Sequence, residues 1–577
     1  MLPAAISLAF QVCHLADLDL TPATQGWGKP MRNRSVTDTP LRIAGQTFAD
    51  GVGTHARSVI RIGLDGKATR FRALCGVDDN AKSDRASVMF RVVADGKTRW
   101  RSPLMRWNTR AIEADVPLKG VRSLLLIVED GGDGIDHDHA NWADASIEYR
   151  GKAPKTKKGP SDRPVILTPR PPKSPRMNGP MRTGVRPGSP LVFRIPTTGD
   201  RPMRFRAEGL PEGVSLDPDS GILSGALDRR GTYPIRIVAT NRRGSASRTL
   251  EVVCGDEIAL TPHMGWNSWY VWEHRVSDAV MRAAADAMVS TGLADHGWQY
   301  VNIDDAWSRR PSDGATRDDT GRILPNEKFP DMRALTDHIH TKGLRAGIYT
   351  SPGPLTCGGY EGSFGHERID AETFADWGFD FLKHDWCSYQ PASWSLEELQ
   401  KPYRLMGGLL KEQKRDIVYN LCQYGMGKVW QWGKEVGGHS WRTAGDLGIG
   451  FPLFREGLDL YADEELHRYA GPGAYNDPDY LLLGELSNFA GGLRKTPFTP
   501  NEQYVQVTFW CLVSAPLILS GDVTKLDAFT LSLLTNDEVI AVDQDPWVKA
   551  AKRVARDEDL EVWAKPLSDG SLAVGLL

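Results

Sequence analysis

Alternation of hydrophobic and polar positions dominates the first quarter of the chain. The run Ser87–Ala94 has hydrophobic residues at every second position, as expected for a strand with one buried face. Asp95 and Gly96 follow it directly and are typical of a hairpin turn. Short runs of this kind recur over residues 15–150, which predicts a β-sandwich domain there.

The pattern breaks in the next stretch. Residues 151–190 contain ten prolines and ten Lys or Arg, but only one acidic residue, Asp162. Proline fixes φ and removes a backbone donor, so residues 151–163 are expected to form an extended linker. We interpret its positive charge as that of a solvated tether rather than of a site for an acidic partner. Residues 164–254 are strand-rich again and predict a second, smaller β-domain.

From residue 257 onward, short strands alternate with amphipathic helices. One helix is expected after Ser277 as N-cap, and another over Asp331–Lys342, where Gly343 ends it. Eight strands over residues 257–547 predict a (β/α)8 barrel, in which the active site lies at the C-terminal strand ends. Those ends are expected near Asn267, Asp304, Tyr349, Asp385, Gln423, Arg442, Asp477 and Leu519.

Composition and charge argue against several classes of function. The net charge of -3 and pI near 6.5 give no electrostatic reason to expect nucleic acid as a partner. No apolar run is long enough to predict a membrane span. Residues 1–12 are apolar but lack basic residues, as in a poor or clipped signal peptide. Neither metal-ligand spacing nor a phosphate-binding loop is evident, so we expect no metal and no cofactor.

Candidate chemistry gathers at the predicted strand ends. On the strand that ends at Asp385, alternation places Lys383 and Asp385 on one face and His384 on the other. A lysine beside a carboxylate favours the ionised form, as a nucleophile requires. Carboxylates and tryptophans follow several other strands, and together they form the kind of ring that a sugar pocket needs.

Five motifs follow one another along the barrel region. They are Thr261–Trp269, Asp304–Trp307, Leu382–Asp385, Trp441–Asp446 and Gly471–Asp479. In this order they resemble glycoside hydrolase family 27, which comprises α-galactosidases, α-N-acetylgalactosaminidases and a few relatives. The resemblance implies a retaining exo-glycosidase that removes terminal α-D-galactosyl residues from oligosaccharides or polysaccharides. In that mechanism Asp385 corresponds to the nucleophile and Asp446 to the acid/base.

The same resemblance implies the binding residues. They are Trp266, Trp269, Asp304, Asp305, Lys383, Gln423, Arg442 and Asp479. The two adjacent aspartates would accept hydrogen bonds from the sugar 4- and 6-hydroxyls, and Lys383 and Arg442 would donate to hydroxyls around C2 and C3. Cys357 and Cys387 occupy positions that pair as a disulfide in the family. Such a pair indicates an oxidising location: secreted, periplasmic or cell-surface.

Two departures from the family pattern leave the exact specificity open. This chain has Gln423-Tyr424 after Cys422 where many relatives have Glu-Trp, and Tyr480 where Met is common. The alternatives within the family are an α-N-acetylgalactosaminidase, a β-L-arabinopyranosidase and an isomalto-dextranase. A non-catalytic carbohydrate-binding protein is the alternative from another class, but both catalytic aspartates are present. The sequence leaves the oligomeric state open.

The flanking regions resemble accessory domains. Gly51–Ala56 and Asp138–Asp144 resemble the NPCBM type of carbohydrate-binding module, which implies a galactose-binding-like jelly roll. There Asp138, His139 and Asp144 are more consistent with holding a loop than with holding a sugar or a cation. Residues 164–254 resemble an Ig-like spacer domain. Residues 548–577 resemble the start of the family's C-terminal antiparallel β-domain, so a truncated sequence is expected.

Overall fold

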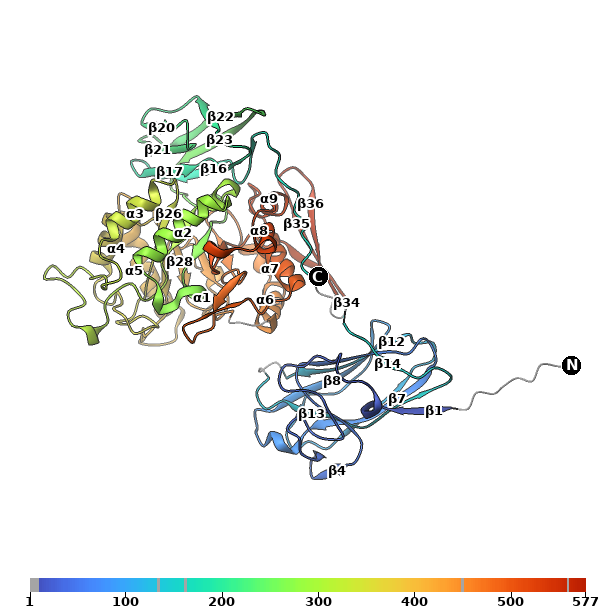
Figure 1. The fold of residues 1–577 in the computed structure, drawn as a ribbon. Coiled ribbons are helices and arrows are strands. Elements are labelled where there is room, and N and C mark those ends of the chain that lie inside the picture. Colours follow the sequence, from blue (N-terminus) through green and yellow to red (C-terminus); the bar gives the residue numbers. More distant parts are fainter. Residues whose placement is uncertain (1–9, 132–134, 160–162, 448–450, 558–559) are drawn as a thin grey trace. The chain divides into compact units, whose positions relative to one another are not determined.

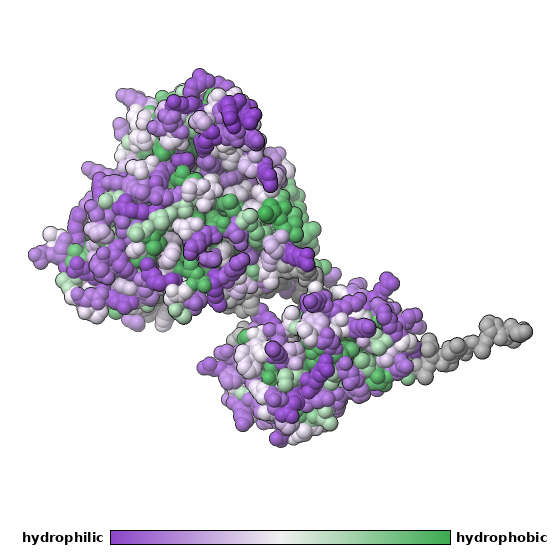
Figure 2. Space-filling view, in the orientation of Figure 1, coloured by the Kyte–Doolittle hydropathy of each residue, from purple (hydrophilic) through white to green (hydrophobic). Residues whose placement is uncertain are grey.

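The structure is a computed structural model that describes residues 10–131, 135–159, 163–447, 451–557 and 560–577. The chain divides into two compact units, residues 1–161 and 162–577, and each is described by itself (Figure 1). Figure 2 shows a mostly hydrophilic visible face with hydrophobic residues in small groups. This fits apolar side chains that are largely buried in separate cores.

The first unit is a sandwich of two six-stranded antiparallel sheets. One has the order β11-β7-β13-β5-β2 with β1 beside β13, and the other β10-β8-β12-β6-β14 with β9 beside β8. The strands are β1 (Gln11–His14), β2 (Met31–Arg32), β5 (Gly51–His55), β6 (Ser58–Gly63), β7 (Ala68–Val77), β8 (Ser87–Ala94), β9 (Lys97–Arg101), β10 (Met105–Arg106), β11 (Ile112–Pro117), β12 (Ser123–Asp130), β13 (His139–Tyr149) and β14 (Lys155–Thr156). A small hairpin, β3 (Leu41–Ile43) and β4 (Gln46–Phe48), is added to them.

The alternation in β8 has the predicted consequence. All four of its hydrophobic positions at period two are fully buried, and Asp95 and Gly96 at the turn have φ of 49° and 77°. Trp142 at the centre of the core packs edge-on against Phe71 and Phe90. β14 also pairs with β6, so part of the stretch expected to be linker belongs to the sandwich.

Two of the three loop residues singled out in this unit, Asp138 and His139, have structural partners. The Asp138 carboxylate accepts a hydrogen bond from the Ser87 backbone N–H at 2.8 Å, and the His139 ring stacks on Trp27. Asp144 is exposed and has a φ of 45°. The contact of Asp138 ties its loop to β8, in keeping with a role in holding the loop.

The second unit begins with the smaller sandwich. Its two sheets have the orders β16-β23-β22-β19 and β17-β21-β20. The strands are β16 (Arg182–Val185), β17 (Pro190–Arg194), β19 (Arg204–Glu208), β20 (Val214–Leu216), β21 (Ile222–Ala226), β22 (Gly231–Asn241) and β23 (Gly244–Cys254), with the short pair β15 (Arg176–Met177) and β18 (Thr197–Thr198) beside them. Arg186 joins this sandwich to the barrel through Asp416, with Nε 2.5 Å from a carboxylate oxygen. Its guanidinium also donates to the backbone oxygens of Lys411, Gln413 and Arg415.

A parallel eight-stranded sheet forms the barrel. Its order is β30-β29-β28-β27-β26-β25-β24-β33, and a parallel bridge between Leu481 and Leu519 closes the ring. The strands are β24 (Met264–Asn267), β25 (Tyr300–Asn302), β26 (Arg345–Thr350), β27 (Phe381–Asp385), β28 (Val418–Cys422), β29 (Ser440–Arg442), β30 (Tyr475–Asp477) and β33 (Leu517–Leu519). Each predicted strand end lies within two residues of the observed one. The (β/α)8 fold is therefore confirmed.

Helices surround the strands, as Figure 1 shows. They are α1 (Trp269–Trp272), α2 (Asp278–Ser290), α3 (Met332–His340), α4 (Glu367–Trp377), α5 (Leu396–Glu412), α6 (Phe451–Asp463), α7 (Pro500–Leu512), α8 (Ala528–Leu534) and α9 (Asp537–Asp543). Ser277 caps α2 by accepting from the Val280 N–H, and Asp331 caps α3 in the same way. Gly343, with φ of 73°, follows α3 where the predicted stop lies. None of the described helices is both long and apolar enough to cross a membrane.

Three antiparallel strands follow the barrel: β34 (Lys552–Asp557), β35 (Leu560–Pro566) and β36 (Leu572–Leu576). Trp563 is fully buried and packs edge-on against Phe509 of α7. These strands agree with the antiparallel β-structure expected after the barrel, and they pack on the barrel through this aromatic contact.

Candidate active site

A polar cavity lies at the C-terminal ends of the barrel strands. Its lining comes from strand ends and from the loops that follow them. The lining residues are Trp269, Tyr270, Asp304, Asp305, Tyr349, Cys357, Lys383, Asp385, Tyr424, Arg442, Asp446, Asp479 and Tyr480. The two aspartates with predicted catalytic roles, 61 positions apart in sequence, thus line one cavity.

Asp385 is held by two phenol groups. Tyr349 donates to its Oδ2 at 2.9 Å and Tyr424 to its Oδ1 at 2.6 Å. Burial raises the pKa of Asp385, while the positive charge of Lys383 and the Tyr424 hydrogen bond pull the pKa down. His384 points to the other side of β27, where its ring contacts Tyr419. The predicted division of this strand into two faces is therefore observed.

Lys383 pairs directly with Asp304 rather than with Asp385. Its Nζ lies 2.8 Å from Oδ2 of Asp304, and the same oxygen accepts from Asn267 Nδ2 at 2.8 Å and Tyr480 OH at 3.0 Å. Burial alone would lower the pKa of Lys383, but the Asp304 carboxylate outweighs it and the pKa is raised. Lys383 therefore stays charged and holds Asp304 at the cavity wall.

Asp305 faces the cavity from a tightly built turn. Its carboxylate accepts from the backbone N–H groups of Ala306 and Gly358, both at 2.7 Å. A Cβ at Gly358 would lie only 2.9 Å from Oδ2 of Asp305, so a larger residue there would push against this contact. Burial raises the pKa of Asp305 to about 6, despite these donors.

Arg442 links two further carboxylates of the cavity. Its guanidinium lies 3.1 Å from Asp446 Oδ1 and 3.3 Å from Asp479 Oδ2. The Asp446 side chain is 61% exposed, whereas that of Asp479 is 1% exposed. Burial raises the pKa of Asp479 to about 6 against the pull of Arg442. Oδ1 of Asp479 has no hydrogen-bond partner among the described residues.

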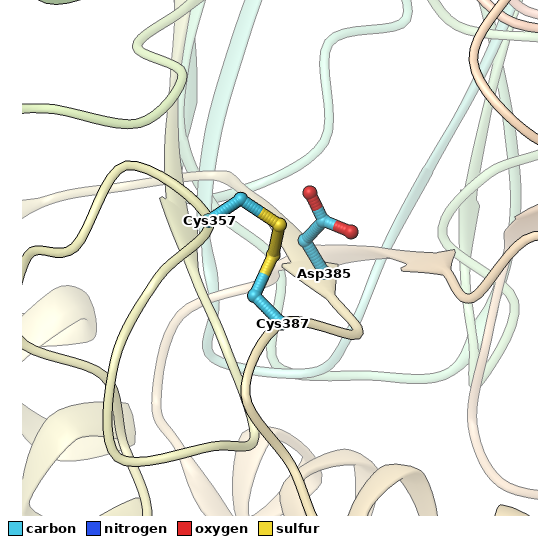
Figure 3. A group of neighbouring side chains, drawn as sticks. All are labelled: Cys357, Asp385 and Cys387. Atoms are coloured by element: carbon cyan, nitrogen blue, oxygen red, sulfur yellow. A yellow bond between two sulfur atoms is a disulfide. The ribbon is translucent and has the colours of Figure 1, made fainter.

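A disulfide borders the cavity. Cys357 and Cys387 are bonded, as the family resemblance implies, and Figure 3 shows the Asp385 carboxylate beside them. These three residues are also the group of described side chains with a spacing suited to a metal ion. Because the two sulfurs are bonded to each other, they are not available as thiolate ligands.

Two predicted binding residues do not reach the cavity lining. Trp266 is fully buried and its indole N–H donates to the Gly521 backbone oxygen, because alternation along β24 turns its side chain away from the barrel axis. Gln423 is buried and its amide donates to the Met426 backbone oxygen. Trp269, by contrast, lines the cavity.

Four tyrosines that shape the site were not predicted from the sequence as site residues. One of them, Tyr270, lines the cavity and donates to Oδ2 of Asp479 at 3.1 Å. Tyr349 and Tyr424 donate to Asp385, and Tyr480 donates to Asp304. The position of Tyr349 at the end of its strand was a usable signal, because strand ends converge on the site. Tyr424 and Tyr480 stood out only as departures from the family pattern.

The comparisons with known proteins agree with this geometry. The family described as Alpha galactosidase A matches residues 261–545. Over 320 residues the chain is 40% identical to an alpha-galactosidase of Cyamopsis tetragonoloba, and the match covers 55% of this chain and 72% of that protein. The chain belongs to the α-galactosidase family. The predicted assignment to glycoside hydrolase family 27 is confirmed.

Further relatives of this chain support the same assignment. Alpha-galactosidase A of Homo sapiens is 34% identical over 340 residues, with 56% of this chain and 74% of that protein covered. The crystal structure of a Bacteroides fragilis protein superposes with a TM-score of 0.65 at 37% identity. The superposition covers 72% of this chain and 88% of the Bacteroides fragilis chain. The NPCBM/NEW2 domain matches residues 11–148 and the He_PIG Ig domain residues 175–255.

Proposed function

We propose that this α-galactosidase releases terminal α-D-galactosyl residues by double displacement, with Asp385 as nucleophile and Asp446 as acid/base. The observation that carries the proposal is one cavity that holds both carboxylates. One is buried and fixed by two tyrosine hydroxyls, and the other is 61% exposed. A nucleophile needs a fixed position, whereas an acid/base must reach both the leaving group and the incoming water.

The first step forms a covalent intermediate. Asp446 donates its proton to the glycosidic oxygen as the bond from that oxygen to C1 breaks, and a carboxylate oxygen of Asp385 bonds to C1. Asp446 is exposed in the free enzyme, so the substrate itself covers this carboxyl when it binds.

The second step reverses these roles. Asp446, now ionised, takes a proton from a water molecule as the water oxygen attacks C1. The bond from C1 to Asp385 breaks and its electron pair returns to the carboxylate. The anomeric configuration is inverted twice, so the released galactose retains the α configuration.

The remaining cavity residues fit recognition of the sugar. We assign Asp304 and Asp305 to the 4- and 6-hydroxyls, Lys383 and Arg442 to hydroxyls around C2 and C3, and Asp479 to the 2-hydroxyl. The unpartnered Oδ1 of Asp479 supports its part of this assignment, because a buried acceptor without a donor in the free protein gains a partner when a hydroxyl arrives. Trp269 supplies an apolar wall for the sugar ring.

The accessory domains and the disulfide support a location of the protein outside the cytoplasm. Disulfides persist in oxidising compartments, and Cys357–Cys387 borders the cavity itself. The NPCBM match points to a carbohydrate-rich setting. We therefore assign the protein a secreted, periplasmic or cell-surface location and an α-galactoside oligosaccharide or polysaccharide as substrate.

The test is hydrolysis of para-nitrophenyl α-galactoside by the wild type and by Asp385→Ala, with and without azide. The account predicts activity in the wild type, its loss in the variant, and rescue by azide with formation of β-galactosyl azide. Asp319→Ala, which removes an exposed carboxylate outside the cavity lining, is the matched control. The corresponding N-acetylgalactosaminide and β-L-arabinopyranoside, with a dextran digest, separate the family alternatives. If a folded wild type prefers one of these, the proposed specificity is wrong.

A further inference from the structure

Tyr424 stands in an unusual relation to the nucleophile. It lies two residues after the end of β28 and has a φ of 64°, a left-handed conformation that is uncommon for a residue with a bulky side chain. Its hydroxyl lies 2.6 Å from Oδ1 of Asp385, and its side chain lines the cavity. Backbone strain of this kind persists where the surrounding structure enforces it, and it is concentrated at functional sites.

The surroundings fix Tyr424 in this place. Its hydroxyl lies 3.9 Å from Sγ of Cys357, one of the two sulfurs of the disulfide at the cavity edge. The next residue, Gly425, has a φ of 82°, and a Cβ there would lie 2.2 Å from the Thr443 backbone oxygen. The loop is thus held against its neighbours from both sides, and the phenol is directed at Asp385.

The two oxygens of Asp385 have separate donors. Tyr349, on the strand next to β27, serves Oδ2, whereas Tyr424, on a loop, serves Oδ1. Burial raises the pKa of the Tyr424 phenol, so the group remains protonated and acts as a donor. A donor at 2.6 Å from a carboxylate makes a charge-assisted hydrogen bond, which is about twice as strong as a neutral one.

We propose that Tyr424 is a further catalytic residue, which stabilises the Asp385 carboxylate as the leaving group of the second step. This rests on the proposed role of Asp385 as nucleophile. In the first step the carboxylate gives an electron pair to C1 and loses its charge, so its hydrogen bond from Tyr424 weakens. In the second step water attacks C1, Asp446 takes the proton, and the electron pair of the C1–O bond returns to Asp385. The Tyr424 hydrogen bond strengthens as this charge develops.

Loss of the hydroxyl therefore has opposite effects on the two steps. The free carboxylate is less stabilised in Tyr424→Phe, which favours formation of the intermediate. The returning carboxylate is also less stabilised, which slows breakdown of the intermediate. We expect kcat to fall about tenfold or more, the usual effect of losing a hydrogen bond to a charged group. KM falls with it, because the intermediate accumulates, and kcat/KM changes much less.

The test is pre-steady-state hydrolysis of an α-galactoside with a good leaving group by the wild type, Tyr424→Phe and Tyr389→Phe. The last variant is the matched control, since Tyr389 packs on Trp386 and lies outside the cavity lining. With a nitrophenyl α-galactoside, Tyr424→Phe is expected to release a burst of nitrophenol close to one equivalent per enzyme molecule. A slow steady state follows the burst. Its intact mass in the steady state is expected to show a galactosyl adduct.

The pH dependence of kcat/KM in Tyr424→Phe is a second readout, which would not change if Tyr424 only shaped the pocket. The Tyr424 hydrogen bond lowers the pKa of Asp385, so its loss is expected to shift the acid limb of kcat/KM to higher pH. A raised KM at unchanged kcat, without a burst or adduct, would show that Tyr424 only shapes the pocket and would overturn the proposal. An inactive wild type, or azide rescue absent in Asp385→Ala, would instead contradict the proposed function itself.

Discussion

The buried pair of Lys383 and Asp304 offers a test of how the cavity wall is held. We predict that Lys383→Met lowers both stability and activity. Methionine has nearly the length of lysine and leaves no large gap, so the change removes the charge and its hydrogen bond but little packing. It leaves the Asp304 carboxylate, 3% exposed, without its cation at 2.8 Å.

The expected magnitude follows from burial. Breaking a buried ion pair by removing one partner costs about 3 to 5 kcal/mol. Asp304 keeps the donors Asn267 and Tyr480, and the cavity admits some water, so we expect the lower end, about 3 kcal/mol. Activity should fall at least about a hundredfold, since the displaced carboxylate no longer meets the sugar hydroxyls in the required geometry.

Scanning calorimetry of the full chain, with kcat/KM measured in parallel, is the assay. Lys342→Met is the matched control, because its ion pair with Asp286 is partly exposed, at 25% and 56%, and should contribute less than about 1 kcal/mol. Asp304→Asn in the Lys383→Met background removes the stranded charge and should recover much of the stability, though not the activity. If Lys383→Met melts like Lys342→Met and stays active, the reasoning about this pair is wrong.

Three further predictions concern single contacts. Tyr480→Phe removes one of three donors to Oδ2 of Asp304, so KM should rise several-fold while the melting temperature changes little; an unchanged KM would contradict this. Burial alone would raise the pKa of Asp380, but His340 and Arg415 outweigh it and lower the pKa. The stability that this carboxylate contributes is present above its unfolded pKa of about 4 and is lost as pH falls further. The free energy of unfolding of Asp380→Asn should therefore decrease less with falling pH than that of the wild type. Cys357→Ser opens a disulfide with a sequence separation of 30 and should cost roughly 3 to 4 kcal/mol, measurable as a lower melting temperature that reducing agent does not change further.

The sequence predicted the framework of the site because regular structure repeats. Parallel strands of a barrel end at one rim, and four of the eight predicted strand ends, at Asp304, Tyr349, Asp385 and Arg442, gave residues that line the cavity. Alternation correctly separated Lys383 and Asp385 from His384. Applied to β24, the same rule would have turned Trp266 away from the cavity, but the family resemblance was followed there instead.

The donors to the carboxylates were harder to predict. Tyr424 reaches Asp385 only because its backbone adopts a left-handed conformation, which no hydrophobic pattern encodes. Tyr480 reaches Asp304 from the opposite part of the barrel, so the contact depends on closure of the ring. Contacts of this kind depend on the assembled tertiary structure and not on local sequence.

The most direct test of the central claim is to trap the covalent intermediate. The protein is incubated with 5-fluoro-α-galactosyl fluoride, a substrate whose good leaving group favours the first step while the electron-withdrawing fluorine slows the second. Peptide mapping by mass spectrometry then locates the label. The account predicts a single galactosyl ester on the peptide that contains Asp385, formed faster than it is hydrolysed. A label on another carboxylate, or turnover with inversion at the anomeric carbon, would contradict it.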